Sequence, residues 1–238
     1  MKLELQRPQT QPLQSIPLLR HAVKEEWRRF LELAPPHDYR PGNVLFYQDN
    51  LPLGLHFISS GRVKLIKEDR AGRRQIVRIV QGPDLLGDRS FFAEKPYRCT
   101  GEVMEDATIR FLQPHHFWSI FGRNPDTLRL LAQRFALELG RAEDYMHCIS
   151  VCTVNARMAT RLLQASKRTD LAGAAKGEFL LAETRTELAQ VLGTTPEAVS
   201  RTLSNLCAKG LIAVSGRRVR VLNEERLRLS ACLHDPLN

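Results

Sequence analysis

Long apolar runs are missing from this sequence. None reaches the roughly 18 residues that a membrane-spanning helix needs, and the opening segment MKLELQRPQTQPLQ lacks the apolar core of a secretory signal. The cysteines are odd in number, and their spacing predicts no disulfide framework; they are Cys99, Cys148, Cys152, Cys207 and Cys232. These absences predict a cytoplasmic protein in a reducing compartment, without membrane contact.

The signature motifs of common enzyme classes are also missing. The sequence contains no P-loop, no HExxH metal site, no GxSxG nucleophile elbow and no CxxC pair. We therefore expect a protein that is not an enzyme. Hydrophobic residues make up 43% of the chain, which is enough for a globular core.

Positive charge is in excess. Lys and Arg number 35 against 26 Asp and Glu, for a formal net charge of +9, and the last 88 residues carry more than half of that excess. Fixed positive charge attracts phosphates, so a polyanionic partner is expected toward the C-terminal end. The alternative is that the charge serves solubility alone.

Two kinds of pattern follow each other along the first half of the chain. Residues 15–33 place apolar side chains at helical spacing, as one helix or two short ones, and Pro35 and Pro36 end that segment. From Tyr39 to Leu112, short runs rich in β-branched and aromatic residues alternate with turn signals; the runs are VLFYQ, LHFIS, VKLIKE, QIVRIV and TIRFL. This pattern predicts an all-β sandwich or barrel.

A long helix is predicted after this β region. Asn124 can cap it and Pro125 suits its first position. An apolar stripe then recurs in steps of three and four residues over about seven turns. The stripe predicts a dimer seam, with an ordinary core helix as the alternative; its members are Leu128, Leu131, Phe135, Leu139, Ala142, Met146 and Ile149.

Residues 184–210, TRTELAQVLGTTPEAVSRTLSNLCAKG, predict a helix-turn-helix. Gly193 can end a first helix in the left-handed conformation, and Thr195 can cap a second helix. This second helix points Glu197, Ser200, Arg201 and Thr195 outward from its N-terminal half, the part of such a helix that reaches base edges. Arg bonds guanine, Glu accepts from cytosine, and Ser bonds a base or a phosphate.

The segment after Gly210, LIAVSGRRVRVLN, predicts a β-hairpin with a basic tip. Beside a helix-turn-helix, such a hairpin is a wing, and Arg217 and Arg218 at its tip are placed to contact flanking phosphates. The alternative is a solvated turn with no partner.

The order of these elements resembles the CRP/FNR family of bacterial regulators over nearly the whole chain. Residues 60–64, SGRVK, look like the family's β-roll turn, and residues 124–126, NPD, look like the start of its dimer helix. Residues 197–201, EAVSR, are similar to the Glu-x-x-Ser-Arg signature of the FNR-like branch. Pro196 stands where the cyclic-AMP-receptor branch carries an Arg, so the resemblance favours the FNR-like branch.

The resemblance implies an α+β fold in four parts. Residues 1–14 would form an N-terminal arm, and residues 15–123 a β-roll sensor domain like a cyclic-nucleotide-binding jelly roll. Residues 124–150 would form the dimerisation helix, and residues 151–238 a winged helix-turn-helix. It further implies a homodimer on double-stranded DNA, half-sites like TTGA in a palindrome, and contact with RNA polymerase.

Residues 87–100 look like the family's phosphate-binding cassette. Cyclic-nucleotide binders of the family hold the ribose with a Gly-Glu pair and the cyclic phosphate with an Arg-Ser pair. Here Gly87 and Arg98 match, while Asp88 replaces Glu and Cys99 replaces Ser. These substitutions argue against cyclic AMP, since unmade polar contacts in a buried site are costly. Alternatively, Asp88 and Arg98 form an internal ion pair.

The sequence also gives little support for an adenine contact on the dimer helix, for an iron–sulfur cluster or for haem. The adenine-contacting Thr-Ser pair of the family aligns with Ala142 and Glu143, which supply no hydroxyl. No cysteine precedes Cys99, so the four thiolates of an iron–sulfur cluster are not expected. Haem ligation by His115, His116 or His147 lacks a diagnostic spacing, and no metal site is predicted.

Cys148 and Cys152 near the end of the dimer helix are either a redox switch between paired chains or small buried apolar residues.

Together, the helix-turn-helix, the wing and the resemblance predict sequence-specific transcription regulation, with a hinge near residues 150–153 setting the spacing of two recognition helices. The rival is a cyclic-nucleotide-responsive module that signals through protein contacts alone.

Overall fold

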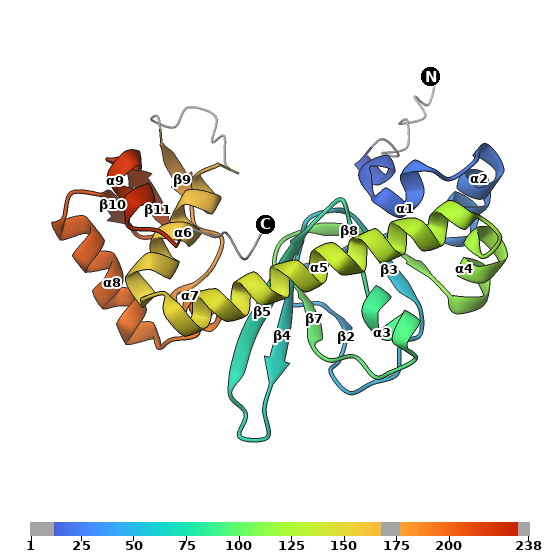
Figure 1. The fold of residues 1–238 in the computed structure, drawn as a ribbon, viewed down its shortest axis with the longest axis horizontal. Coiled ribbons are helices and arrows are strands. Elements are labelled where there is room, and N and C mark those ends of the chain that lie inside the picture. Colours follow the sequence, from blue (N-terminus) through green and yellow to red (C-terminus); the bar gives the residue numbers. More distant parts are fainter. Residues whose placement is uncertain (1–11, 168–176, 233–238) are drawn as a thin grey trace, which may run out of the picture. The chain divides into compact units, whose positions relative to one another are not determined.

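A computed structural model describes residues 12–167 and 177–232, and the chain divides into two compact units between residues 137 and 138. We name residues 12–137 the roll domain and residues 138–232 the C-terminal domain; Figure 1 shows the elements of each. Within the described ranges, no helix combines the length and the hydropathy that crossing a membrane demands.

Two four-stranded antiparallel sheets form the roll domain. The first has the order β1-β8-β3-β6 and the second β2-β7-β4-β5. The strand bounds are β1 Pro36–Tyr39, β2 Val44–Phe46, β3 Leu55–Ser60, β4 Arg62–Glu68, β5 Arg74–Gln81, β6 Asp84–Leu86, β7 Thr100–Val103 and β8 Ala107–Leu112. The predicted β fold is confirmed, and the five runs read from the sequence coincide with β2, β3, β4, β5 and β8.

The inward faces of these strands supply the core. Phe57 on β3 is fully buried and meets Phe30 edge-on, with ring centroids 4.8 Å apart. Burial of apolar surface stabilises the domain, and large aromatic rings such as these bury more of it per residue than smaller side chains do.

Short helices close the domain around the two sheets. Their bounds are η1 Pro12–Ser15, a 3₁₀ turn, then α1 Pro17–Arg20, α2 Lys24–Leu33, α3 Asp88–Ala93 and α4 Pro114–Phe121. Leu13 is fully buried against the roll core. The ordered domain therefore starts before residue 15, where the sequence predicted an arm; residues 1–11 of that arm lie outside the described residues.

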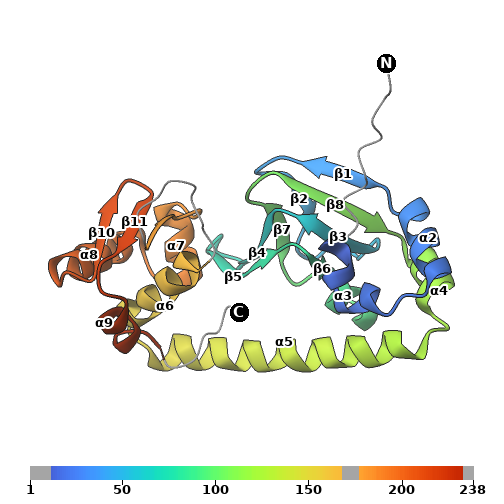
Figure 2. The same ribbon diagram turned by 90° about the horizontal axis from the view of Figure 1, so that it is seen from above.

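The predicted long helix is α5, Pro125–Val151, with 27 residues. It is a single unbroken helix in Figure 2. The Asn124 side chain accepts a hydrogen bond from the Asp126 amide at 3.1 Å, as expected for its cap. The first half of α5 belongs to the roll domain and the second half to the C-terminal domain.

The C-terminal domain packs helices on a small sheet of order β10-β11-β9. Its elements are α6 Val154–Ser166, β9 Glu178–Leu180, α7 Arg185–Leu192, α8 Pro196–Ala208, β10 Ile212–Ser215, β11 Arg218–Val221 and α9 Glu224–Leu229. The predicted helix-turn-helix is α7 and α8. The predicted hairpin is β10 and β11, paired antiparallel with Ser215 opposite Arg218.

Candidate nucleic-acid interface and effector cassette

Local capping interactions build the helix-turn-helix. Thr184 caps α7 in a capping box with Glu187, and Gly193 ends α7 in the left-handed conformation at φ 61°. The Thr194 amide then donates to the Ala189 carbonyl at 2.9 Å. Thr195 caps α8, accepting from the Ala198 amide at 3.3 Å. The turn is thus fixed by short-range interactions that the sequence itself specifies.

One face of α8 holds the helix in the domain. Val199, Leu203 and Leu206 are buried in a core shared with α6, α7 and the sheet. These residues recur at helical spacing, so the opposite face of α8 is left to solvent. The apolar face fixes which side chains the helix can present.

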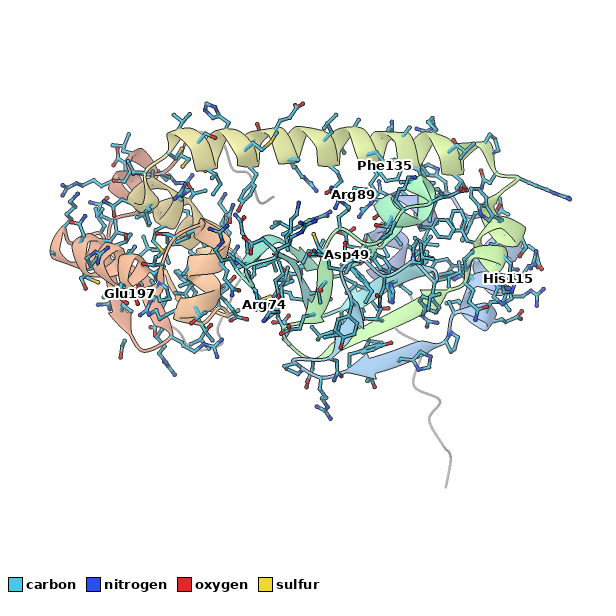
Figure 3. The ribbon with its side chains drawn as sticks, turned by 90° about the horizontal axis from the view of Figure 1, so that it is seen from below. Asp49, Arg74, Arg89, His115, Phe135 and Glu197 are labelled. Carbon is cyan, nitrogen blue, oxygen red and sulfur yellow. The ribbon has the colours of Figure 1, made fainter. Side chains whose placement is uncertain are left out.

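The predicted reading residues lie on the solvent side. Glu197, Ser200 and Arg201 are all exposed, and Glu197 is marked at the start of α8 in Figure 3. The Ser200 hydroxyl donates to the Pro196 carbonyl at 3.0 Å, and Thr195 spends its hydroxyl on the cap. The structure brings the four predicted residues together on the first two turns of α8.

The charge state of Glu197 suits its exposed place at the helix N-terminus. Its own backbone N–H, then the Thr195 hydroxyl and the charge of Arg201, lower the pKa of Glu197. It therefore stays an anion and an acceptor at neutral pH. An anionic acceptor one turn before a cationic donor matches the polar edges of the major groove.

The wing places its two arginines differently. Gly216 turns the hairpin at φ 60°. Arg217 folds back and donates from Nε to the Leu181 carbonyl at 2.9 Å and from its terminal nitrogen to the Ala182 carbonyl. Arg218 is exposed and lies 3.4 Å from Glu178. Arg217 therefore braces the hairpin against the segment after β9, and Arg218 is the more available cation of the pair.

A buried ion pair behind the helix-turn-helix was not predicted. Arg161 on α6 pairs with Glu183, the residue before the Thr184 cap, and both side chains are almost fully buried, at 3% and 1% exposure. Arg161 also donates to Gln164 at 3.3 Å. The pair ties α6 to the start of the α7–α8 unit. No sequence signal predicted this ion pair, because a charged residue in a loop, such as Glu183, is usually exposed.

The effector cassette departs from the sequence expectation at Asp88. Gly87 takes the left-handed conformation at φ 88° and begins α3. Asp88 is buried, and its carboxylate binds Nε of Arg134 on α5 at 2.6 Å. Arg134 also binds Asp84 at 2.7 Å and the Leu85 carbonyl at 2.7 Å. Asp88 therefore pairs with Arg134, and the alternative of an internal pair between Asp88 and Arg98 is wrong.

The electrostatics of this cluster favour a permanent ion pair. Burial lowers the pKa of Arg134, but the carboxylates of Asp88 and Asp84 outweigh burial and raise that pKa overall. The Asp88 carboxylate is thus already occupied by a protein cation. A ligand hydroxyl would have to compete with a charge-assisted hydrogen bond, which is stronger than a neutral one.

The other two cassette residues separate in burial. Arg98 is exposed, whereas Cys99 is buried at 6% exposure. Burial raises the pKa of the Cys99 thiol, against the opposing charges of Arg89, Lys67 and Arg98. Arg89, labelled in Figure 3, has the largest of these opposing effects on that pKa. The sequence did not predict that Arg89 and Lys67 act on Cys99, because these residues belong to separate elements, α3 and β4.

The residues of the predicted dimer stripe on α5 differ in their exposure to solvent. Leu128, Leu139 and Met146 are exposed, at 61%, 62% and 61%, and Ala142 is exposed with them. Leu131, by contrast, is buried at 4% in the roll core. Leu131 is therefore not available to a partner, because the roll core covers it.

Phe135 and Ile149 lie half-buried at the border of this stripe. Phe135 packs on Phe92 of α3, with ring centroids 5.9 Å apart, and points from α5 toward the roll in Figure 3. The histidines considered for haem are on other surfaces: His115 is exposed on α4, with its ring 3.8 Å from that of His116, and His147 is exposed on α5.

Comparison with known proteins agrees with this architecture. Residues 36–124 match the cyclic nucleotide-binding domain family, and residues 156–229 match the Crp-like helix-turn-helix domain family. The two matches together define a regulator that joins a nucleotide-binding-type roll to a DNA-binding domain. The chain belongs to the CRP/FNR family of transcription regulators.

Three relatives illustrate the match. The CRP-like cAMP-activated global transcriptional regulator of Mycobacterium tuberculosis is 26% identical, over 81% of this chain and 86% of its own. The nitrogen fixation regulation protein FixK of Azorhizobium caulinodans is 29% identical, over 82% and 79%. The structure of FixK2 from Bradyrhizobium japonicum superposes with a TM-score of 0.73 at 28% identity, over 84% and 98%. The first of these relatives is named as a transcriptional regulator and the second as a regulation protein, in agreement with the expectation that this chain is not an enzyme.

Proposed function

We propose that two copies of this chain pair and bind a DNA palindrome with TTGA-like half-sites. The carrying observation is the exposed set on the first two turns of α8: Glu197, Ser200 and Arg201 face solvent while Val199 and Leu203 anchor the opposite face. Arg201 reads guanine, Glu197 accepts from cytosine, Ser200 assists, and Thr195 fixes the start of the helix.

The exposed face of α5 supports the pairing. Three large apolar side chains, Leu128, Leu139 and Met146, are each more than half exposed on one helix, with Ala142 between them. Burying them in a helix–helix seam would contribute on the order of 1.5–3 kcal/mol each. We assign residues 124–150 to this dimerisation helix, residues 12–123 to the sensor domain, because Leu13 is part of its core, and residues 151–238 to the DNA-binding domain.

Two further contacts belong to the proposal. Arg218 on the wing binds a flanking phosphate, with Arg217 holding the hairpin in position. DNA-bound protein then contacts RNA polymerase; the support for this step is that some relatives are named as global transcriptional regulators.

We further infer that DNA binding does not need cyclic AMP. The Asp88 carboxylate is held by Arg134, and Cys99 supplies a buried thiol where a nucleotide binder presents a hydroxyl. Some relatives are named as cAMP-activated regulators, and we propose that this chain differs from them in this respect.

A selection of bound duplexes from random DNA tests the proposal. Unliganded protein should enrich one palindrome, and light scattering should give the mass of a dimer. Leu139→Lys should shift that mass toward a monomer, while Leu229→Lys, which changes an even more exposed leucine on α9, should not. Affinity for cyclic nucleotides without enrichment of any DNA sequence would instead support a signalling module.

A further inference from the structure

Three cysteine side chains converge inside the C-terminal domain. Cys148 lies in the last turns of α5, Cys152 directly follows α5, and Cys232 follows α9. Their three sulfur atoms all lie within 4.8 Å of one another, and the Cys148 and Cys232 sulfurs are 3.4 Å apart. Within residues 12–167 and 177–232, these three form the one group of His, Cys, Asp and Glu side chains with metal-ligand proximity.

We propose that Cys148, Cys152 and Cys232 form a three-thiolate binding site for a thiophilic cation of the Zn²⁺ or Cu⁺ class. Cations of this softness choose sulfur ligands, and zinc–sulfur bonds of about 2.3 Å place tetrahedral ligand sulfurs about 3.8 Å apart. The observed spacing lies around that value. On binding, each thiol releases its proton to water and its sulfur forms one bond to the cation.

The surroundings suit such a site. Cys148 is buried, whereas Cys152 and Cys232 are half-buried, so the sulfurs combine a closed side with access from solvent. The Cys232 amide donates to the Thr160 hydroxyl at 2.9 Å, which fixes the backbone of the most distant ligand in the sequence. Anchoring of this kind, outside the ligands themselves, is what orients a metal site.

A positive charge is held next to the Cys148 backbone. Arg157 donates to the carbonyl of Ile149, the residue after Cys148, at 2.9 Å. Its Nε is buried without a hydrogen-bond partner. Three thiolates around Zn²⁺ or Cu⁺ leave a net negative charge, which the Arg157 guanidinium would offset.

A disulfide between Cys148 and Cys232 is the competing chemistry. It needs the sulfurs to close from 3.4 Å to about 2.05 Å, and it leaves the third sulfur unused. A cation uses all three sulfurs and replaces their protons directly.

Cys148 and Cys152 lie at the end of α5, beside the expected hinge, so occupancy by a cation would tie residues 148–152 to the segment after α9. If the proposed DNA-binding function holds, this inference adds a consequence: cation binding changes the affinity for the palindrome. The binding site itself does not depend on that function.

Titration of the reduced, full-length protein with Co²⁺, an optical substitute for Zn²⁺, tests the site. We expect thiolate-to-metal absorption that saturates at one equivalent per chain and is displaced by Zn²⁺. A parallel titration with Cu⁺ against a chromophoric chelator shows which cation is held more tightly. Cys152→Ser and Cys232→Ser should lose the signal, whereas Cys207→Ser, a half-buried thiol elsewhere in the same domain, should keep it. Circular dichroism verifies that each variant is folded.

The site is refuted if neither cation gives a thiolate signal, if the signal survives in folded Cys232→Ser, or if mass spectrometry finds a Cys148–Cys232 disulfide in protein isolated under cellular redox conditions. DNA binding is measured separately. A metal signal with unchanged affinity for the palindrome refutes the coupling to the hinge. A metal signal with no specific DNA binding refutes the proposed function and leaves the site standing.

Discussion

Replacing Arg161 with Met should sharply destabilise the C-terminal domain. Arg161 and Glu183 form an ion pair with side chains only 3% and 1% exposed. The substitution leaves the Glu183 carboxylate buried without its cation. Removing one partner of a buried pair destabilises by about 3–5 kcal/mol, because the remaining charge has lost both water and counter-charge.

An exposed pair provides the scale for comparison. Arg228 and Glu224 on α9 are 57% and 60% exposed, and a surface pair of this kind contributes about 0–1 kcal/mol. Arg228→Ala is therefore the matched control. For a domain of about 100 residues, a loss of 1 kcal/mol lowers Tm by about 4–8 °C. Arg161→Met should lower the Tm of the C-terminal domain by at least about 10 °C, and Arg228→Ala by a few degrees.

The two domains can be followed separately. Both tryptophans, Trp27 and Trp118, lie in the roll domain. Tryptophan fluorescence should thus report an unchanged transition in Arg161→Met, while far-UV circular dichroism shows an earlier one. The double variant Arg161→Met with Glu183→Leu should regain most of the loss, since an apolar pair of similar volume carries no buried charge. Equal, small shifts for Arg161→Met and Arg228→Ala would refute the reasoning.

Three further predictions follow from buried or paired groups. Burial lowers the pKa of His56 to about 4, so between about pH 6.5 and 4 the unfolded chain binds a proton that the folded chain does not. The roll domain should therefore lose on the order of 3 kcal/mol of stability as the pH falls through that window. Denaturant titrations followed by tryptophan fluorescence should show this loss, and His56→Leu should abolish it. Asp88→Ala leaves Arg134 partly unpaired and should lower the Tm of the roll domain. In the unsubstituted chain, cyclic AMP should change the DNA affinity by no more than about twofold. A large effect of cyclic AMP would contradict the inference that Arg134 occupies the Asp88 carboxylate. Arg218→Ala should reduce the salt dependence of DNA binding by about one unit of slope on every sequence. Arg217→Ala should mainly lower the Tm of the C-terminal domain, because two hydrogen bonds to backbone carbonyls are lost. The reverse pattern in salt titrations would refute these roles.

Local signals explain what could be predicted from the sequence. The helix-turn-helix was found because Thr184, Gly193 and Thr195 act within their own turns, and such caps are visible as residue types at fixed spacing. The longer strands were found because β-branched runs and turn residues alternate. In contrast, β1 consists of the mostly exposed residues PHDY, and its pairing with β8 is a long-range interaction that residue types do not encode.

Interactions between distant segments account for the rest. Asp88 was recognised as a cassette residue, but its partner Arg134 lies 46 residues further along the chain. Cys148 and Cys232 are separated by 84 residues, so the thiol cluster could not be read from spacing. Leu131 fits the helical stripe by sequence, yet the roll core covers it. Periodicity shows that a residue lies near a face, and the packing of the domain decides which partner covers that face.

Base reading by α8 is the central claim, and Arg201→Ala tests it most directly. Fluorescence anisotropy with a selected palindrome and with random duplex should show a loss of about 1–3 kcal/mol, or about 5- to 150-fold, on the palindrome alone, with relaxed preference at one base pair of each half-site. Ser204→Ala, an exposed position one turn along the same helix, is the control and should change little. Equal losses on the palindrome and on random DNA for Arg201→Ala would contradict the account.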